Sequence, residues 1–486
     1  MTEATQIRNT RLLEILQNRS SRNFKWLALF SLAHLPLGVL IYLAGPFAIL
    51  HPATVLVVGL YWAANTRFRL ERVALAIAYL VGAEVLWRMA GVPVFWEFGK
   101  YGSAIIAIVA MVKRRHFHIP KLPLIYFVLL IPGCLLILPQ KDIAAIQATL
   151  SFQMSGPFFL LVASWFFYHT KFSPLQVRQL LFVIVVPLLS VAFAALFFTV
   201  TTEEIQFTGE SNFSTSGGFG PNQVSAMLGL GAFITTSCLL IFQNTSRYRV
   251  YLMLAAIFLS AQSVMTFSRG GISNAIGGIA VVAILEFQRP SVAVRRILPI
   301  LLLVVVFFAL VFPVMNNFTD GQLKERFEDV GTSARTEIAA SDLQLFWENP
   351  LFGVGVGAAY VLREPILDRK AVSHTEFSRL LAEHGMFGAV ALLLMAAMII
   401  LNFLRQQTLL GRAFIAGVVV WCCLFMANTG MRMAAPSFMW GLMFVTIVNR
   451  RPESKRLRSD PRLRPTRFRS GHFPSTPDQN GKNEET

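Results

Sequence analysis

The sequence predicts an all-α polytopic membrane protein with about 12–14 transmembrane helices and one large helical loop. Hydrophobic residues make up 55% of the 486 residues and charged residues only 14%, whereas soluble proteins average about 25% charged residues. Many stretches contain the roughly 20 apolar residues that a helix needs to cross a bilayer. These stretches lack the alternation of polar and apolar residues typical of membrane β-strands, which excludes a β-barrel.

About fourteen apolar stretches qualify as spans when they are taken in order along the chain. They lie near residues 25–44, 47–64, 73–90, 93–112, 121–139, 145–168, 179–200, 222–242, 248–267, 271–288, 296–315, 386–404, 412–428 and 432–448. Charged residues interrupt the pair between 73 and 112, namely Glu84, Arg88, Glu97 and Lys100. We expect Glu84 and Arg88 to pair, because an unpaired arginine at mid-membrane costs roughly 2.5–3.5 kcal/mol.

The distribution of basic residues predicts the orientation of the chain. The membrane domain, residues 25–448, is preceded by the basic segment 1–24 and followed by the basic segment 449–486. Alternate loops are also basic, as in the loop near residues 67–72. Because basic loops stay on the cytoplasmic side, we expect both termini to be cytoplasmic and the polar segment 316–385 to face outward.

Charge and cysteine content limit the expected partners and cofactors. The formal net charge is +17, and the tail 449–486 is rich in Pro, Ser and basic residues, which predicts disorder. Membrane topology and attraction to anionic lipids explain this charge, so no nucleic-acid partner is predicted. All four cysteines lie in predicted spans without a paired motif, which indicates neither a disulfide framework nor a zinc site.

The outward segment 316–385 is the expected place for chemistry, because a long block rich in Arg, His, Asp and Glu must be solvated. Ser373 and Glu376 have the spacing of a capping box, which predicts a helix that begins at His374. The helix dipole then favours a neutral imidazole that can accept a proton from a hydroxyl group. The alternative is an ordinary loop histidine, and the spacing does not separate the two.

Three arginines are candidates for binding an anionic group on the outward side. Arg269 follows a predicted span, and the two glycines after it are expected to break the helix so that a bulky headgroup can approach. Arg335 is predicted on a helix from Ser333 to Phe346, and Arg432 lies between the last two spans. Two guanidinium groups can hold a diphosphate in a bidentate way. The alternative for Arg269 is a side chain that merely extends to the interface.

Other polar motifs have structural interpretations. The run from Asn349 to Gly357 is expected to end a helix in a close-packed turn. Asn222 and Gln223 follow an outer turn and either line a polar pocket or cap a helix, and capping is the favoured interpretation. The spacings Glu376–Arg379 and Arg379–Glu383 fit ordinary helical pairing, so these carboxylates and His384 are weaker candidates for chemistry.

Taken together, these motifs resemble the O-antigen ligase and polymerase superfamily of bacterial envelope enzymes. The stretches that carry the resemblance are Gly220–Gln223, Ser268–Gly271, Arg335 with Phe346–Gly355, and His374 with Leu381–Gly388. The similarity covers roughly residues 210–445, and the earlier part of the chain is similar only in being helical and apolar. The predicted spans outnumber those usual in the family, which makes the region 73–112 a candidate re-entrant or peripheral pair.

The resemblance implies a metal-independent, inverting glycosyltransferase of the type C architecture in the bacterial inner membrane, with no cofactor. The donor that it implies is an undecaprenyl-diphosphate-linked glycan, the acceptor is a glycan or lipid A-core, and membrane lipids are the other partners. The outward segment 316–385 would then be a periplasmic loop. Carried over residue by residue, the roles of diphosphate ligand and reaction-centre histidine fall on Arg269, Arg335 and His374. The resemblance does not separate O-antigen ligases from O-antigen or exopolysaccharide polymerases, and it leaves the sugar and the oligomeric state open.

A flippase for lipid-linked oligosaccharides is the alternative from another functional class. Transport predicts polar sites near the membrane midplane, broken helices and paired repeats. This chain instead concentrates its ionisable groups in the outward segment, which favours an enzyme.

Overall fold

The computed structural model describes residues 24–137, 142–242, 245–288, 290–329, 334–369 and 371–448. Nearly all regular structure in these residues is helical, so the prediction of an all-α polytopic membrane protein is confirmed. The predicted N-terminal segment up to residue 23 and the predicted tail 449–486 lie outside the described residues.

The elements follow one another with short connections. The first half contains the helix Phe24–Leu43, α2 Gly45–Ala64, α3 Leu70–Met89, α4 Phe98–Lys113, α5 Lys121–Leu129, α6 Ile131–Leu135, α7 Ile143–Phe167, α8 Pro174–Thr201, η1 Ser214–Ser216, α9 Pro221–Ile241 and α10 Ser246–Met265. The second half contains α11 Arg269–Glu286, α12 Pro290–Val306, η2 Phe307–Val311, α13 Phe312–Phe318, α14 Gln322–Glu328, α15 Ala334–Glu348, α16 Ala359–Leu362, α17 Glu364–Leu367, α18 Glu376–Arg405, α19 Leu409–Thr429 and α20 Ala434–Leu442. Strands β1 Lys171–Phe172 and β2 Thr446–Ile447 pair in parallel.

Nine helices among the described residues are long and apolar enough to cross a membrane. They are Phe24–Leu43, Ile143–Phe167, Pro174–Thr201, Pro221–Ile241, Ser246–Met265, Arg269–Glu286, Arg296–Phe318, Glu376–Arg405 and Leu409–Thr429. The other predicted spans are helical but shorter or more polar. For example, the 16 residues of α4 extend only about 24 Å at 1.5 Å per residue, which is less than the hydrocarbon thickness.

The charged residues of α3 and α4 are buried in pairs. Arg88 Nη2 lies 2.7 Å from Glu84 Oε1, as predicted, and Lys100 Nζ lies 2.5 Å from Glu97 Oε2. Ser155 on α7 joins the second pair, since its Oγ atom donates to Glu97 and accepts from Lys100, each at 3.1 Å. Both pairs therefore face other helices instead of lipid, which explains how an apolar bundle tolerates four charges in this region.

Helix α9 lies at the centre of the bundle and packs closely against α11. Its apolar window is entirely buried, whereas the window of Arg296–Phe318 is only 11% buried. A Cβ atom at Gly229 would lie 2.2 Å from Gly271 O, and one at Gly271 would lie 2.0 Å from Ser225 O. The expectation that the glycines after Arg269 break the helix is wrong, because α11 continues through them and they permit this close crossing.

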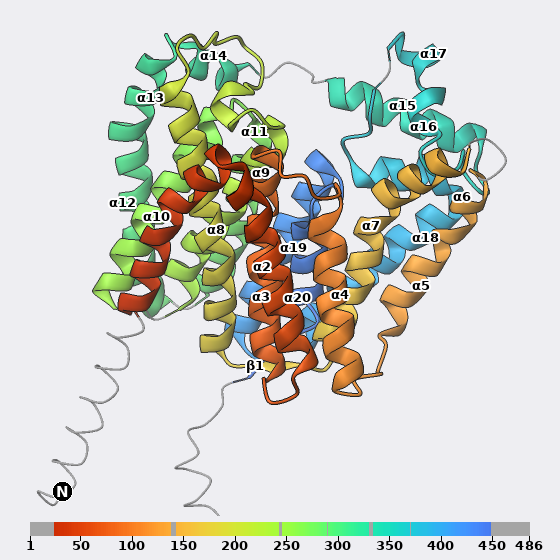
Figure 1. The fold of residues 1–486 in the computed structure, drawn as a ribbon, viewed down its shortest axis with the longest axis horizontal. Helices are drawn as coiled ribbons and strands as arrows, with labels where there is room; N and C mark the ends of the chain where they lie inside the picture. The colour runs from red at the N-terminus through yellow and green to blue at the C-terminus, as the bar shows by residue number, and fades with distance from the viewer. Residues whose placement is uncertain are drawn as a thin grey trace, which may run out of the picture. The chain divides into compact units, whose positions relative to one another are not determined.

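The polar segment lies at one end of the helices. Figure 1 shows α14, α15 and α17 at this end, here called the loop end, and β1 at the opposite end, here called the strand end. Helix α15 agrees with the predicted helix around Arg335, although Ser333 lies outside the described residues. Helix α18 starts within the predicted loop, but it kinks at Gly385, where φ is 57° and ψ is −134°. The kink separates the polar turns 376–384 from the apolar span.

The predicted close-packed turn after α15 is confirmed. Gly353, Gly355 and Gly357 all have positive φ angles, of 70°, 89° and 75°. A Cβ atom at Gly353 would lie 2.5 Å from backbone atoms of α18, so only glycine fits there. Gly357 N donates to Glu383 Oε1 at 3.0 Å, and Arg379 Nη1 donates to Glu383 Oε2 at 2.7 Å. The turn is thereby attached to the buried polar face of α18.

Candidate functional site

Arg335 connects α15 to the helix bundle through two amide side chains. Its Nη1 atom donates to Asn428 Oδ1 on α19 at 3.1 Å, and its Nη2 atom donates to Asn222 Oδ1 on α9 at 3.3 Å. Both acceptors are neutral, and no ion pair between described residues includes Arg335. The guanidinium group is therefore oriented without being neutralised, and it can still bind an anion.

The two asparagines belong to a chain of hydrogen bonds at the loop end. Ser268 Oγ donates to Asn222 Oδ1 at 2.7 Å, and Asn428 Nδ2 donates to Asn274 Oδ1 at 2.8 Å. The interpretation of Asn222 as a helix cap is wrong, because Gly220 occupies the N-cap position of α9. The side-chain carbonyl oxygen of Asn222 instead accepts hydrogen bonds from Ser268 and Arg335, and a charged donor on α15 offers a stronger hydrogen bond than a backbone N–H does.

Two further arginines lie near Arg335. Arg269 begins α11 and donates from Nη1 to the backbone carbonyl of Asp329, while Arg326 Nε on α14 donates to Phe267 O at 3.1 Å. Phe267 forms the turn between α10 and α11 with a φ of 57°, a conformation that non-glycine residues rarely adopt. Burial and the charges of Arg269 and Arg326 lower the pKa of Arg335. The three cations therefore act on one another electrostatically.

His374 lies in the loop before α18, and the capping box predicted around it is wrong. Helix α18 starts at Glu376, and its N-cap is Thr375, whose Oγ1 atom accepts a hydrogen bond from Phe377 N at 3.3 Å. Ser373 Oγ instead donates to the carboxylate of Asp342 on α15, at 3.1 Å from Oδ2. The Ser373 hydroxyl group, which the local pattern assigned to a helix cap, thus donates to a buried carboxylate 31 positions earlier in the chain.

His374 is nevertheless neutral near pH 7, for a different reason. Burial lowers its pKa to about 4, and the positive charges of Arg432, Arg335 and Arg363 add to this effect. Neutral imidazole has a free nitrogen lone pair, so His374 can accept a proton from a hydroxyl group beside the arginines.

Arg432 attaches the loop before α18 to the last two helices. Its Nη2 atom donates to Ser373 O at 2.8 Å, next to His374 in the chain. Its own backbone carbonyl accepts a hydrogen bond from Arg88 Nη2 at 3.2 Å, and Arg88 lies 4.7 Å from the centre of the Trp96 ring. The Glu84–Arg88 pair of α3 is therefore connected to the site through the backbone of Arg432.

An apolar groove opens at the same end of the bundle. Its volume is about 440 Å³, and it lies between the final turns of α8 and α10 and the helix containing η2 and α13. Met265 lines the groove and is two residues from Phe267, the residue that accepts a hydrogen bond from Arg326. The groove can therefore hold an alkyl chain while a charged end group lies among the arginines.

The structure brings most predicted site residues together at the loop end. The residues that lie there are Arg269, Arg335, Arg432, His374 and Asn222. Gln223 follows Asn222 on α9, but its buried Oε1 atom has no hydrogen-bond partner among the described residues. The described residues contain no group of three or more His, Cys, Asp or Glu side chains suited to a metal ion.

Several supporting residues of the site were not predicted from the sequence. These are Arg326, Asn274 and Asn428, together with the pair Asp342 and Arg363. An asparagine inside an apolar span is itself a signal, because a buried amide without a hydrogen bond is unfavourable by roughly 1–3 kcal/mol. Nothing in the local sequence distinguishes Arg326 from an exposed loop arginine.

The central part of this site lies in a segment that matches a known protein family. Residues 254–393 match the model of the O-antigen ligase family, and they include Arg269, Arg335 and His374. A search of curated proteins found no match to the chain. The matched segment, less than a third of the chain, contains all of α11, the polar segment and the first part of α18 up to residue 393. Over residues 254–393, this multi-pass membrane protein is similar to O-antigen ligases, which confirms its resemblance to the O-antigen ligase and polymerase superfamily.

Proposed function

We propose that the protein is an inverting membrane glycosyltransferase that transfers an undecaprenyl-diphosphate-linked glycan to an acceptor hydroxyl group in the synthesis of a cell-surface polysaccharide. The observation that carries this proposal is Arg335, which two neutral amide oxygens orient and which lies close to Arg269 and Arg326, near a neutral histidine. The apolar groove beside the arginines suits the polyprenyl chain of such a donor. The family match agrees with ligase or polymerase chemistry.

The basic residues support an orientation in the bacterial inner membrane. Arg67, Arg69, Arg72 and Arg178 lie at the strand end, opposite the site. Because basic residues remain on the cytoplasmic side, the strand end is cytoplasmic and the loop end faces the periplasm. Donor and acceptor then meet on the side of the membrane where surface glycans are assembled.

The reaction needs one bond to form and one to break. The acceptor oxygen attacks the anomeric carbon as the bond from this carbon to the diphosphate breaks, and the electron pair leaves with the diphosphate. Arg269, Arg326 and Arg335 stabilise the charge that grows on the leaving group, a role that otherwise falls to a divalent cation. His374 takes the proton of the acceptor hydroxyl group, and attack opposite the leaving group inverts the configuration.

Replacing His374 with Ala should lower donor consumption by about 100-fold to 10,000-fold, which is the usual contribution of a general base. The assay uses purified protein in detergent with a lipid-linked donor and an acceptor glycan. His118→Ala is the matched control, because His118 is an exposed loop histidine outside the site, and it should keep full activity. Native turnover in a folded His374→Ala protein would remove His374 from the mechanism.

The same assay separates the enzyme from a flippase. Detergent provides no second compartment, so a flippase would consume no donor under these conditions. Absence of product from the unmodified protein, with donor and acceptor both supplied, would favour transport.

The pH dependence of kcat/KM should show an acid limb near pH 4. Protonation of His374 removes the base, and burial with neighbouring cations lowers the pKa of its imidazole to about 4. Arg432→Gln removes one of these cations, so the imidazolium is less disfavoured, the pKa rises, and activity is lost at a higher pH than in the unmodified protein. A wild-type limb near pH 6.5, or an unmoved limb in Arg432→Gln, would contradict this assignment.

The surface glycans of a deletion strain distinguish the possible acceptors. A polymerase predicts loss of long chains with a single repeat unit still attached to lipid A-core. A ligase predicts complete loss of attachment while lipid-linked polymer accumulates. An exopolysaccharide polymerase predicts loss of secreted polysaccharide with unchanged lipopolysaccharide.

A further inference from the structure

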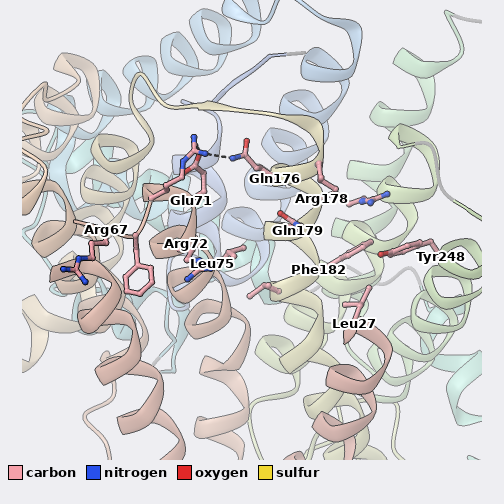
Figure 2. Close-up of a pocket in the computed structure, with 14 residues that line it drawn as sticks. Leu27, Arg67, Glu71, Arg72, Leu75, Gln176, Arg178, Gln179, Phe182 and Tyr248 are labelled. Atoms are coloured by element: carbon pink, nitrogen blue, oxygen red, sulfur yellow. Dashed lines mark hydrogen bonds and ion pairs between the residues drawn. The ribbon is translucent and has the colours of Figure 1, made fainter. Parts of the chain in front are cut away.

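The strand end carries a basic pocket that the proposed reaction does not use. Its volume is about 740 Å³, and it lies where α3, α8 and α10 begin, beside the start of the helix Phe24–Leu43. Figure 2 shows Arg67 and Arg72 near the start of α3, and Arg178 on α8 beside Tyr248. Helix N-termini carry partial positive charge, so three converging helix starts add to the charge of the arginines.

Two arginines of this pocket, Arg72 and Arg178, have no ion-pair partner among the described residues. Glu71 is the acidic residue of the lining, and it is already engaged, because Arg69 Nη2 lies 3.4 Å and Gln176 Nε2 lies 2.8 Å from its Oε1 atom. The pocket therefore offers cationic groups to an external anion.

Aromatic rings orient two of these cations. The Arg72 guanidinium lies 5.2 Å from the centre of the Phe68 ring, and the Arg178 guanidinium lies 5.0 Å from that of Tyr248. Contacts of this kind hold a guanidinium group without cancelling its charge. The arginines are thus partly arranged before any ligand binds, which reduces the entropy lost on binding.

We infer that this pocket binds the phosphate headgroup of an anionic phospholipid. A lipid fits better than a soluble anion because Leu27, Leu75 and Phe182 line the same pocket and can contact acyl chains. The neighbouring residues Trp26 and Leu29 on the first helix are 65% and 58% exposed, so apolar surface continues from the pocket along this helix. Basic pockets between transmembrane helices are suited to phospholipid headgroups.

Titration of fluorescent phosphatidylglycerol into the full-length protein in phosphatidylcholine nanodiscs tests this inference. The double variant Arg72→Gln/Arg178→Gln should weaken binding by about twenty-fivefold, because each arginine near an anionic surface contributes about fivefold. The matched control is Arg249→Gln, which removes an arginine from the start of α10 that does not line the pocket, and it should bind as the unmodified protein does.

A second variant keeps the inference testable if the double variant does not fold. Gln179→Trp fills the pocket without removing charge, and it should also weaken binding of phosphatidylglycerol. A loss of about fivefold in Arg249→Gln, the same per removed arginine as in the double variant, would indicate general surface charge and would contradict specific binding in the pocket. Displacement of the lipid by an equal concentration of glycerol phosphate would overturn the assignment to a lipid and indicate a soluble anion.

Discussion

Replacing Arg335 with Ala should reduce donor consumption by about 100-fold to 1000-fold, the loss expected when one preorganised charge-stabilising donor is removed. Two neutral amide oxygens, from Asn222 and Asn428, orient the guanidinium group at 3.3 Å and 3.1 Å. The protein therefore holds a full positive charge in one position without neutralising it. Such a charge contributes most where negative charge develops on a leaving diphosphate.

Arg335→Lys should recover only part of the activity. A lysine keeps the charge, but it is a point donor that cannot contact both asparagines and a phosphate in the planar geometry of arginine. Turnover is measured in detergent with lipid-linked donor, and thermal unfolding is measured in parallel as a check of folding.

Arg369→Ala is the matched control for Arg335. Arg369 lies in the same polar segment and pairs with Glu337 at 2.8 Å, but both side chains are exposed. Its removal should leave turnover unchanged. If Arg369→Ala and Arg335→Ala reduced turnover equally, the loss would reflect the charge of the whole segment, and the role of Arg335 would be excluded.

Replacing Asp342 with Ala should destabilise the packing of α15 on α18 by about 3–5 kcal/mol, the usual effect of removing one member of a buried ion pair. Asp342 is fully buried, and its Oδ1 atom lies 2.9 Å from Nε of Arg363, which is 1% exposed. Ser378 Oγ donates to its other carboxylate oxygen at 2.6 Å. Without Asp342, the buried Arg363 guanidinium loses its carboxylate partner and the Ser378 hydroxyl loses its acceptor.

Hydrogen exchange of α15 and of residues 371–375 measures this effect locally, and thermal unfolding in detergent measures it globally. Turnover should fall as well, because Ser373 also donates to Asp342 and directly precedes His374. The control is Glu337→Ala on the same helix, since an exposed ion pair contributes only about 0–1 kcal/mol. Similar exchange in both variants would show that the buried pair does not hold the loop.

Several predictions depended on local spacing and succeeded where the interaction was also local. The pairs Glu84–Arg88 and Arg379–Glu383, each four residues apart on a helix, formed as expected. The turn through Gly353 and Gly357 also formed, because the positive φ angles at its alternate residues favour glycine.

Predictions failed where a distant residue competed for the same group. Ser373 was expected to cap its own helix, but the carboxylate of Asp342 accepts its hydrogen bond. Asn222 was expected to cap α9, but its carbonyl oxygen faces Arg335, 113 positions later in the chain. Capping patterns describe only neighbours in the chain, so they carry no information about either competitor.

Composition and long apolar stretches were sufficient to establish an all-α membrane protein, because the cost of burying polar groups in hydrocarbon acts on each segment of the chain separately. Short motifs were sufficient to indicate the superfamily. The arrangement of the site depended on tertiary packing, because Asn222, Arg335 and Asn428 come from three helices and meet only when these pack together. The neutral state of His374 likewise follows from burial and from arginines on other elements, which no spacing along the chain specifies.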